Sequence, residues 1–494
     1  MGSIEKQGMT NRQVWRTLII LSCLGLIVMF DETMILPAIP DFIREFNISY
    51  SMSSWLLSAY IIAAAVMTPI GGRLSDIYGK KRILLIVMAV YTIGIVAGRF
   101  ATNFEFMLIA RAAQGIGMAM FPIAFGIIRE VFPENKLAIG QTIFSSTFSG
   151  GAVVGLLGGA AIIQHFGWQA TFLALLPAAI GLWFTIIRFI HTPSSASNGS
   201  NNNNRPNDRT VDVRGTLALA ATIITFLAGV TFLETHSAGA WYQAASLFTA
   251  SAASLAAFVT IEKRARSPLL DFGLMTDKNF LLPTIILMLT FMSIFMVYLT
   301  IPVMVRSPEP LGFGGDAVEA ASVQLPFMIV LLIGTIMSGF ILNKIKNTRL
   351  TLIGTSISAV GFFILLMFHS TEVMVSAGLT ILAAGLSLSI TGAFNVILLS
   401  VSMQMTGIAL GMTLLLNLVG MSVGPASAGI LQQTNMGTIE GVAGQFPTQE
   451  AYKLIFLVAA MISLASAALA LAVTRRKAVP AVAHTSPPKT DENS

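Results

Sequence analysis

Long apolar runs, separated by short polar breaks, recur along the chain from its first quarter to its last. A helix of about 20 apolar residues is long enough to cross the hydrocarbon core of a bilayer. Hydrocarbon offers no water to the backbone, so each run must satisfy its own N–H and C=O groups as a helix. The pattern predicts an all-α polytopic membrane protein with 14 transmembrane helices, over residues 16–39, 54–72, 83–103, 106–129, 137–162, 168–190, 213–233, 241–261, 280–304, 318–341, 349–368, 373–398, 405–431 and 451–473.

Composition supports this pattern and excludes a soluble enzyme. Of the 494 residues, 55% are hydrophobic and 11% are charged, whereas a soluble chain carries roughly 25% charged residues. No glycine-rich loop with a phosphate-binding lysine is present, so ATP is not the direct energy source. We expect no enzymatic activity and no metal site in the membrane, because the five histidines fall in predicted loops or the tail: His165, His191, His236, His369 and His484.

Positive charge is distributed unevenly between the two sets of loops. Twenty-four of the 29 Lys and Arg residues fall on one set of loops and tails, and Arg111 lies inside a predicted helix. The positive-inside rule places the richer set in the cytoplasm. We therefore predict a multi-pass protein of the cell membrane with both termini cytoplasmic. The formal net charge of +6 reflects topology and implies no nucleic-acid partner. The opposite loops hold only Arg44, Arg99, Arg306 and Lys453.

Two polar connections divide the chain into six, two and six predicted helices. The first is rich in Asn and cannot build a packed core, and the second is basic at its start. We predict an N-terminal six-helix bundle, an Asn-rich cytoplasmic linker, two inserted helices, a cytoplasmic connection, a C-terminal six-helix bundle and a cytoplasmic tail, over residues 1–190, 191–212, 213–261, 262–279, 280–474 and 475–494.

An internal repeat relates the two predicted bundles. Gly151, Gly155 and Gly159 recur every four residues, and Gly420, Gly424 and Ala428 repeat that spacing 269 positions later. The segment 72–82 maps onto 339–349 with a displacement of 267. Two similar bundles that face each other across a central cavity are typical of transporters. The glycines would let helices approach closely, and Pro425 follows the second of them in the later repeat.

Four motifs carry a resemblance to a known family. The segment Gly72-Arg73-Leu74-Ser75-Asp76-Ile77-Tyr78-Gly79-Lys80-Lys81-Arg82 resembles the signature loop of the major facilitator superfamily, with Ile77 where a basic residue is usual. Residues 111–117 resemble a motif in the fourth helix of the superfamily. Residues 55–60 and 31–40 are similar to helix motifs of its fourteen-helix drug:proton antiporter branch, although Leu36 and Pro37 depart from the branch pattern. The resemblance covers the whole chain.

The resemblance implies proton-coupled export, but one departure leaves the direction of transport open. The family has Gly-Pro in the fifth helix, where this chain has Gly155-Leu156. The proline is retained only in the repeat partner, at Gly424-Pro425. A proton-coupled importer or a dedicated metabolite exporter of the same fold therefore stays an alternative.

Asp31 is the main candidate for proton coupling. It lies about 22 Å along its helix from Arg16, at 1.5 Å per residue, in the outer half of a hydrocarbon core roughly 30 Å thick. Intramembrane charges are costly and usually functional. Arg111 lies at a similar depth and can pair with Asp31, and Gln114 shares its helix face. The alternative is a fixed salt bridge between helices.

Glu32 is adjacent to Asp31 and about 100° around the helix. It either shares the cavity or pairs with a polar neighbour, and the sequence does not separate these two readings. Two close carboxyl groups would couple their protonation. We therefore group Asp31, Glu32 and Arg111 as proton-coupling candidates.

The signature loop is predicted to work as a cytoplasmic gate. We expect Asp76 to hold this gate by pairing with a cation such as Arg129 or with the positive end of a helix. The alternative for the basic residues is a role in topology alone. The gating candidates are Gly72, Arg73, Asp76, Gly79, Arg82 and Arg129.

Substrate-cavity candidates lie mainly on the ninth predicted helix. Phe291, Phe295 and Tyr298 share one face of it, and aromatic residues suit variable apolar ligands. Ordinary lipid or helix contact is the simpler explanation for them. Gln114, Asn395 and Asn417 are further candidates as polar groups inside the bundles.

Together these features favour a secondary transporter that exports amphipathic drugs or toxic small molecules by proton antiport. The expected partners are a small-molecule substrate and the lipid bilayer. The proton is the coupling ion, no cofactor is needed, and we expect a monomer. A non-transporting membrane sensor is a rival from another class, but it would not need an acid and an arginine at similar depth.

Overall fold

The computed structural model describes residues 11–190, 213–232, 240–264, 272–341, 345–401 and 406–475. The predicted linker 191–212 lies outside these residues, as do residues 265–271 of the second connection and 476–494 of the tail.

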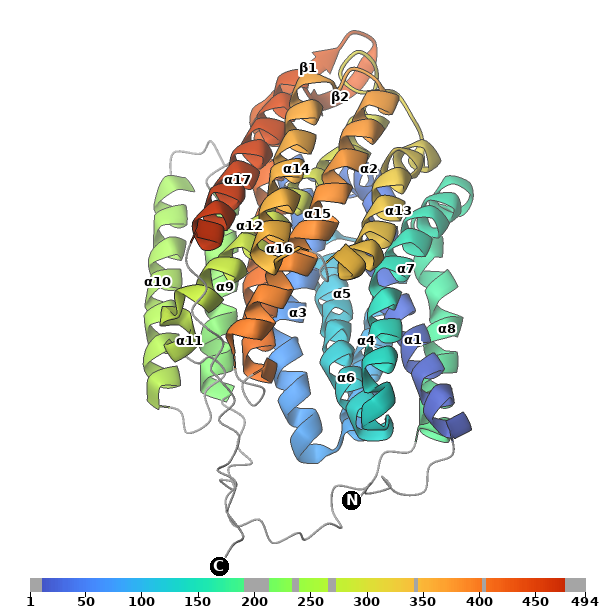
Figure 1. The fold of residues 1–494 in the computed structure, drawn as a ribbon. Coiled ribbons are helices and arrows are strands. Elements are labelled where there is room, and N and C mark those ends of the chain that lie inside the picture. The colour runs from blue at the N-terminus through green and yellow to red at the C-terminus, as the bar shows by residue number, and fades with distance from the viewer. Residues whose placement is uncertain are drawn as a thin grey trace, which may run out of the picture.

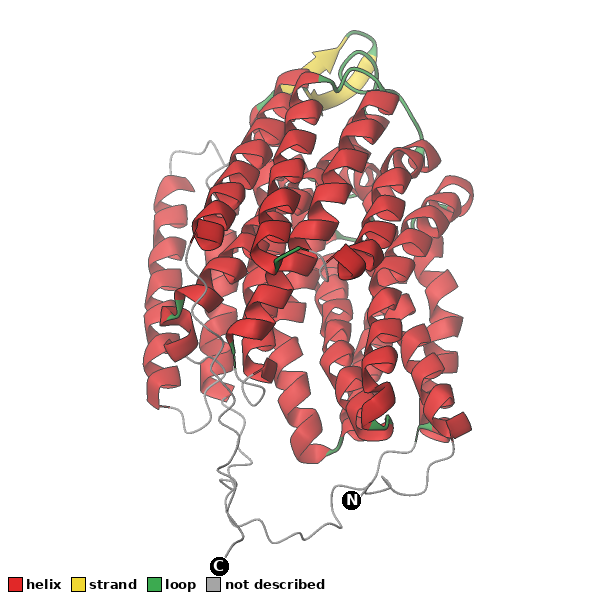
Figure 2. Ribbon diagram, viewed as in Figure 1, coloured by secondary structure: helices red, strands yellow, loops and turns green. Residues whose placement is uncertain are grey.

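The described chain is almost entirely helical (Figures 1 and 2). Its elements are α1 (Asn11–Met34), the 3-10 turn η1 (Leu36–Ala38), α2 (Ile39–Glu45), α3 (Tyr50–Tyr78), α4 (Lys80–Arg99), α5 (Phe104–Gly115), η2 (Ile116–Ala119), α6 (Met120–Val131), α7 (Glu134–Phe166), α8 (Gln169–Phe189), α9 (Val213–Phe232), α10 (Ala240–Arg264), α11 (Phe272–Thr276), α12 (Lys278–Arg306), α13 (Ala317–Ile341), α14 (Asn347–Met367), α15 (Glu372–Ser400), α16 (Thr406–Thr434), β1 (Met436–Ile439), β2 (Val442–Pro447) and α17 (Gln449–Arg475).

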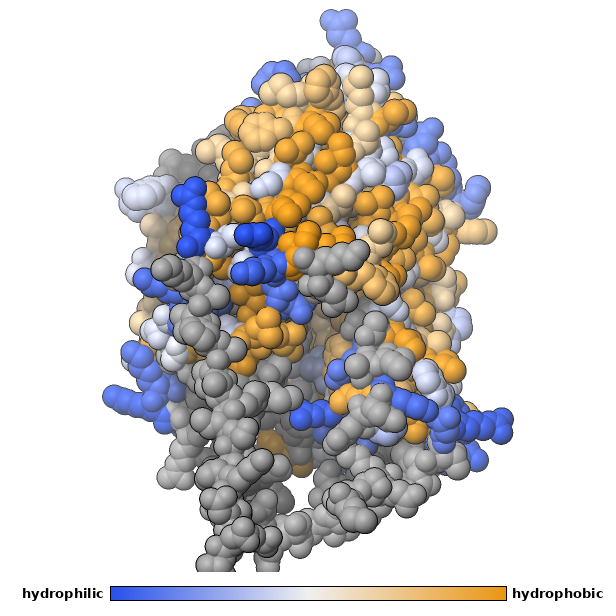
Figure 3. Space-filling view, in the orientation of Figure 1, coloured by the Kyte–Doolittle hydropathy of each residue, from blue (hydrophilic) through white to orange (hydrophobic). Residues whose placement is uncertain are grey.

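The prediction of an all-α membrane fold is confirmed. In the described part of the chain, thirteen helical segments are long and apolar enough to cross a membrane, and each coincides with a predicted span. The remaining predicted span coincides with α9, whose described apolar stretch, Leu217–Phe226, is shorter. Apolar side chains cover much of the visible face of the molecule (Figure 3).

Local sequence signals fix several helix ends. The side chains of Ser49 and Asn103 accept hydrogen bonds from the backbone N–H groups of Met52 and Phe106, so they cap the starts of α3 and α5. Gly79 has a φ of 95° and separates α3 from α4, a conformation that residues with a Cβ rarely adopt. These signals place the helix boundaries within a few residues of the apolar runs.

The recurring glycines occupy matching positions in two groups of helices, which we term the first bundle (α1–α8) and the second bundle (α12–α17). In the first bundle, α7 packs on α1, and a Cβ atom on Gly151 would lie 2.6 Å from Met29. In the second, α16 packs on α12, and a Cβ on Gly424 would meet the carbonyl of Met292. These close approaches lie within each bundle, between its first and fifth spans.

The glycines of each repeat serve the same packing role. A Cβ atom on Gly155 would lie 2.6 Å from the Cα of Phe30, and one on Gly159 would lie 2.6 Å from the Cα of Met34. In the second bundle, a Cβ on Gly420 would meet the carbonyl of Met288. The structure places these glycines against helices of their own bundle, where they allow close backbone contact.

The inserted pair α9–α10 packs along the side of the molecule (Figure 1). Ser251 of α10 donates a hydrogen bond to the Thr222 carbonyl of α9 at 2.9 Å, and Ser254 donates to the Ala218 carbonyl at 2.8 Å. Hydroxyl-to-carbonyl contacts of this kind hold helices together in lipid, where the hydrophobic effect does not. On its other side, α9 contacts both α3 and α16.

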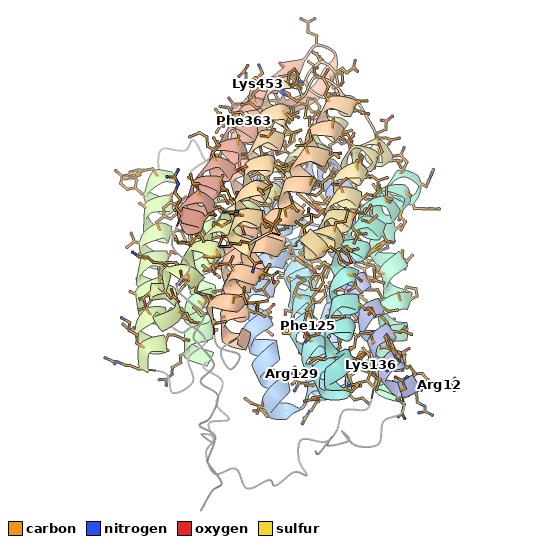
Figure 4. All side chains as sticks on the ribbon, in the orientation of Figure 1. Arg12, Phe125, Arg129, Lys136, Phe363 and Lys453 are labelled. Carbon is orange, nitrogen blue, oxygen red and sulfur yellow. The ribbon has the colours of Figure 1, made fainter. Side chains whose placement is uncertain are left out.

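The strand pair β1–β2 and helix α2 lie at one end of the molecule, which we term the hairpin end (Figure 1). The strands pair antiparallel, and Gly441 in their connection has a φ of 81°. Lys453 lies toward this end, whereas Arg12, Arg129 and Lys136 lie toward the opposite end (Figure 4). The positive-inside rule assigned these residues to opposite sides of the membrane in the same way.

Contacts between the two bundles gather toward the hairpin end. Among the described residues, the hydrogen bonds that join the bundles link Tyr50 with Gln433 at 3.1 Å, Gln164 with Ala317 at 3.3 Å, Ser58 with Ser422 at 3.3 Å, and Arg306 with Asp41 and Pro37. Each of these residues lies in the half of its helix or connection nearer to that end. The two bundles are therefore closed together at the hairpin end.

Candidate functional site

A fully buried ion pair lies inside the first bundle. Asp31 is near the end of α1 and Arg111 is in α5, and both side chains are 0% exposed. The Nη1 atom of Arg111 lies 3.6 Å from Oδ1 of Asp31. Helical rise predicted similar depths for the two residues, and the structure brings their side chains together.

Gln114 connects the two charges. Its Nε2 donates to Asp31 Oδ1 at 3.1 Å, and its Oε1 accepts from Arg111 Nη1 at 3.1 Å. Gly94 of α4 allows α5 to lie close, because a Cβ atom there would be 2.8 Å from the Gln114 backbone nitrogen. Gly115 contributes in the same way, since its Cβ would meet the carbonyl of Tyr60.

Helix α3 completes the surroundings of Arg111. Its Nε donates to the Leu56 carbonyl at 3.2 Å, and its guanidinium lies over the Tyr60 ring, 4.5 Å from the centroid. An arginine stays protonated and can stack and form directed hydrogen bonds at once. Neither partner was predicted from the sequence, although Tyr60 ends the motif at residues 55–60. Arg111 is thus held by α1, α3 and its own helix.

The buried cluster is only partly satisfied. Asp31 Oδ2 and Arg111 Nη2 are both buried and have no hydrogen-bond partner among the described residues. The free energy of an incompletely paired, buried polar network changes strongly when one of its charges changes, because water does not screen that change. A proton bound at Asp31 Oδ2 would neutralise the carboxylate and weaken its pair with Arg111. The arrangement can therefore convert proton binding into a change in helix contacts.

Glu32 has different surroundings from its neighbour. Its side chain is partly exposed, and its carboxylate makes no hydrogen bond within the described residues. Thr33 on the other side donates to the Ala152 carbonyl of α7 at 3.0 Å. The sequence left open whether Glu32 pairs with a polar neighbour, and among the described residues the structure shows no such pair.

The aromatic candidates of α12 lie near a small pocket in the second bundle. Phe295 and Tyr298 stack with ring centroids 5.2 Å apart, and Tyr298 lines the pocket. Phe291 is partly buried against the apolar core. The pocket lies between α12, α13 and α15 and is lined by Ile294, Val297, Tyr298, Gln324, Phe327, Leu379 and Leu382.

The two asparagine candidates lie in different places. Asn395 donates to the Thr391 carbonyl of its own helix at 2.9 Å, so its amide is partly used locally. Asn417 is 2% exposed, and its Oδ1 has no hydrogen-bond partner among the described residues. Of the two asparagines, Asn417 therefore has the less satisfied side chain.

The signature loop lies at the end opposite the hairpin end. The backbones of Arg73 and Asp76 belong to α3, but their side chains lie outside the described residues, so the expected pairing of Asp76 is left as a prediction. Arg82 and Arg129 are exposed. Lys80 forms an ion pair with Glu130 at 2.6 Å, a contact that sequence analysis did not single out. A Cβ atom on Gly72 would lie 3.8 Å from the Cβ of Pro122 in α6, an ordinary contact distance.

A second charged contact, between the bundles, was also missed. Arg306 at the end of α12 donates to Asp41 at 2.6 and 2.8 Å and to the Pro37 carbonyl at 2.6 Å. We had noted Arg306 only as one of four basic residues on the sparsely charged side. Basic residues are rare on that side, and a cation there does not set the membrane topology. The sequence could therefore have marked Arg306 as a candidate for a structural contact.

We predict that Arg306→Gln will open the hairpin end. Truncating one partner of a hydrogen-bonded charge pair costs about 2–5 kcal/mol, which corresponds to a rise in the open population by a factor of about 30 or more. In a variant with Cys23 replaced by Ser, spin labels at Glu105 of α5 and Val318 of α13 would lie on the two bundles. Pulsed electron paramagnetic resonance should then report a longer distance between the labels. Arg44→Gln is the matched control, since Arg44 also contacts Asp41 but is 69% exposed. Unchanged distances in R306Q would contradict the role of this contact.

Several known transporters are similar in sequence to this chain. The family model described as "Major Facilitator Superfamily" matches residues 21–425. The chain is 28% identical over 363 residues to Multidrug resistance protein 3 of Bacillus subtilis, covering 72% of this chain and 66% of that protein. It is 27% identical over 448 residues to the multidrug efflux pump LfrA of Mycolicibacterium smegmatis, covering 89% and 85%. It is 23% identical to the tetracenomycin C resistance and export protein of Streptomyces glaucescens over 430 residues, covering 86% and 77%.

Solved structures of transporters share the fold. A bacterial homologue of the human lysosomal transporter Spinster, in an inward-facing and occupied conformation, superposes with a TM-score of 0.64 at 18% identity, covering 95% of this chain and 98% of that one. An auto-inhibited peptide transporter of the POT family gives 0.62 at 14% identity, covering 94% and 98%. At these identities the likeness concerns the fold.

Proposed function

We propose that this chain, which belongs to the major facilitator superfamily, exports amphipathic drugs or other toxic small molecules in exchange for protons. It is a membrane transporter and not an enzyme. Relatives named for multidrug resistance and efflux support drug export. The coupling to protons rests on the buried site.

The observation that carries proton coupling is the pair Asp31–Arg111. Both charged side chains are fully buried, and among the described residues one oxygen of the acid has no hydrogen-bond partner. A charge in such a place is costly and is usually retained for function. The acid can exist in two forms, paired with Arg111 or protonated and released. Each form favours a different arrangement of α1 against α3 and α5.

We further infer that the hairpin end faces the outside of the cell, with both termini cytoplasmic and the protein acting as a monomer. In this orientation the contact of Arg306 with Asp41 closes the outer side. A small molecule would then reach the site from the cytoplasm or the inner leaflet. Protons would enter from the outside in the opposite state. Their return inward is driven by roughly 2.3 kcal/mol per charge for each 100 mV of potential.

Substrate-driven proton flux in proteoliposomes tests this function. The purified full chain is reconstituted with a pH-sensitive dye inside, and ethidium or tetraphenylphosphonium is added on one side. Antiport predicts that protons leave the compartment that the drug enters, and that this proton movement occurs only when active protein is present. Protein-free liposomes and liposomes with heat-inactivated protein are the controls. Drug movement with no accompanying proton movement would refute proton coupling.

The same experiment addresses the alternative of a proton-coupled importer or a metabolite exporter. Leu156, fully buried in α7 where the family's exporters carry proline, is the residue that favours this alternative. An importer would move protons and substrate in the same direction. A metabolite exporter would show antiport only with compounds outside the drug panel.

A further inference from the structure

Three helices of the first bundle bring basic residues to one corner of the molecule, at the end opposite the hairpin end (Figures 1 and 4). Helix α8 packs on both α1 and α4. Arg12 and Arg16 lie in the first turns of α1, Lys81 lies at the start of α4, and Arg188 lies at the end of α8. We term these four residues the basic corner.

One phenyl ring and one helix end hold most of these charges together. The guanidinium of Arg16 lies over the Phe189 ring, 4.7 Å from its centroid, and that of Arg188 lies 5.5 Å from the same centroid. Lys81 Nζ donates to the Ile187 carbonyl in the last turn of α8 at 2.7 Å, where the helix dipole favours a cation. Two guanidinium groups from different helices therefore share one ring.

The carboxylates of the described residues do not balance these charges. Helices α4 and α8 contain no Asp or Glu, and α1 contains none before Asp31. Within the described part of the chain, Arg12, Arg16 and Arg188 form no ion pair, and the buried Nε of Arg16 has no hydrogen-bond partner. Topology requires positive charge on this side, but it does not require two guanidinium groups on one ring. Such an arrangement favours an anion from outside the chain.

Exposed apolar side chains continue from the basic corner toward the middle of the membrane. Ile19 lies one turn beyond Arg16 on α1 and is 61% exposed, and Phe184 lies one turn before Arg188 on α8 and is 60% exposed. Cys23, a further turn along α1, is also exposed. Exposed apolar surface of this kind marks contact with a membrane. A cationic end joined to an apolar run is complementary to an anionic headgroup with its acyl chains.

We propose that the basic corner binds the headgroup of an anionic phospholipid from the leaflet at this end of the molecule. The lipid phosphate accepts hydrogen bonds from the guanidinium groups of Arg16 and Arg188, whose planar donors match phosphate oxygens. The rest of the basic corner adds charge, and the acyl chains lie along Ile19 and Phe184. A zwitterionic lipid is bound less well, because the same arginines repel its ammonium group.

The number of charges sets the size of the expected preference. A Lys or Arg near an anionic leaflet contributes an attraction that corresponds to about fivefold in affinity. Two guanidinium groups at one headgroup therefore predict that an anionic lipid is enriched beside α1 by about fivefold or more over a zwitterionic lipid.

Cys23 makes this preference measurable, because it is the only cysteine of the chain. The full chain is labelled there with a bimane fluorophore and placed in phosphatidylcholine nanodiscs. Phosphatidylglycerol or phosphatidylcholine with a nitroxide on the acyl chain is then added in parallel series. Cys23 lies about 10 Å beyond Arg16 along the helix, so the acyl chain of a lipid bound at the corner reaches the fluorophore. We expect labelled phosphatidylglycerol to give the same quenching at about one-fifth of the concentration or less.

Replacing both arginines of the shared ring tests the assignment. Arg16→Gln/Arg188→Gln should bring the two quenching curves together. The matched control is Arg264→Gln/Arg475→Gln, which removes two exposed arginines from the ends of α10 and α17 and should keep the wild-type preference.

Salt gives a second measurement that needs no substitution. Raising the ionic strength from about 0.1 M to about 1 M shortens the Debye length from about 10 Å to about 3 Å. The preference of the wild type for phosphatidylglycerol should therefore fall. If Arg16→Gln/Arg188→Gln does not give a monodisperse protein, Arg188→Gln replaces it, because Arg188 is exposed.

Each outcome decides the proposal. Equal quenching by the two lipids in the wild type would overturn it, as would a preference that survives the loss of the arginines or the addition of salt. An equal fall in the control pair would show attraction to basic surface in general and would overturn the site. Absence of quenching by either lipid would show that this face does not contact lipid. No substrate or proton gradient enters the assay, so its result is independent of the proposed export function.

Discussion

Replacing Asp31 with Asn is expected to abolish proton-coupled export while leaving a folded protein in the membrane. Asparagine has almost the same shape as aspartate, and its Oδ1 can still accept the hydrogen bond from Gln114 that now spans 3.1 Å. What it lacks is a carboxyl group that can gain and lose a proton. The variant resembles the protonated form permanently, so the pair with Arg111 cannot be remade when the substrate binds.

The measurement is drug-driven proton flux in proteoliposomes, and we expect D31N to fall to the level of protein-free liposomes. Exchange of labelled substrate for unlabelled substrate, without a proton gradient, serves as the companion assay. Loss of proton flux with residual exchange identifies uncoupling. Asp277→Asn is a suitable control, because Asp277 lies at the start of α12 and caps the Asn279 backbone nitrogen. Proton-coupled export at the wild-type rate by D31N would rule out the role of Asp31.

Much of the fold follows from the apolar runs alone. The run predicted at 280–304 is α12, Lys278–Arg306, and that at 373–398 is α15, Glu372–Ser400. The length of an apolar run compared with the thickness of the bilayer is enough to predict such a helix. Local breaks were less predictable. The run 16–39 is interrupted after Met34 by a 3-10 turn that contains Pro37, and the chain then continues as α2.

The β1–β2 hairpin shows a second limit. It lies in a polar connection between two spans, and its strands are only four and six residues long. A two-stranded hairpin is marginal by itself, so the sequence carries no strong signal for it. Here Thr448 after β2 donates its backbone N–H to the Asn435 carbonyl before β1 at 2.9 Å, which ties the base of the hairpin to the end of α16.

Depth along a helix predicted part of the site. Because helical rise is constant, Asp31 and Arg111 could be placed at similar heights, and the structure puts their charged atoms 3.6 Å apart. Depth along a helix does not predict which neighbouring helix a side chain contacts. The contacts of Arg111 with the Leu56 carbonyl and the Tyr60 ring were therefore not predicted. The contact of Asp41 with Arg306 joins residues 265 positions apart. No local pattern encodes such a pairing, and only the closure of two bundles produces it.

Replacing Arg111 is expected to have the largest effect on stability. In Arg111→Gln, Asp31 stays buried with its charge no longer balanced, and removing one member of a buried pair costs about 3–5 kcal/mol. The variant also loses the hydrogen bond to the Leu56 carbonyl and the contact with the Tyr60 ring. Its apparent unfolding temperature in detergent, followed by tryptophan fluorescence, should therefore fall well below that of the wild type, and transport should be lost.

The double variant Asp31→Asn/Arg111→Gln separates charge from packing. If the main cost in R111Q is an unbalanced carboxylate, removing that charge recovers stability, and the double variant is more stable than R111Q alone. Arg111→Lys gives the complementary result, since it restores the charge but not the directed contacts with Leu56 and Gln114, so its stability should lie between R111Q and the wild type. Additive losses in the double-mutant cycle would show that the two residues do not interact energetically. A measured coupling energy, rather than the 3.6 Å distance, would show that Asp31 and Arg111 act as a single switch, because only a pair with a free-energy difference between its two states can respond to a proton.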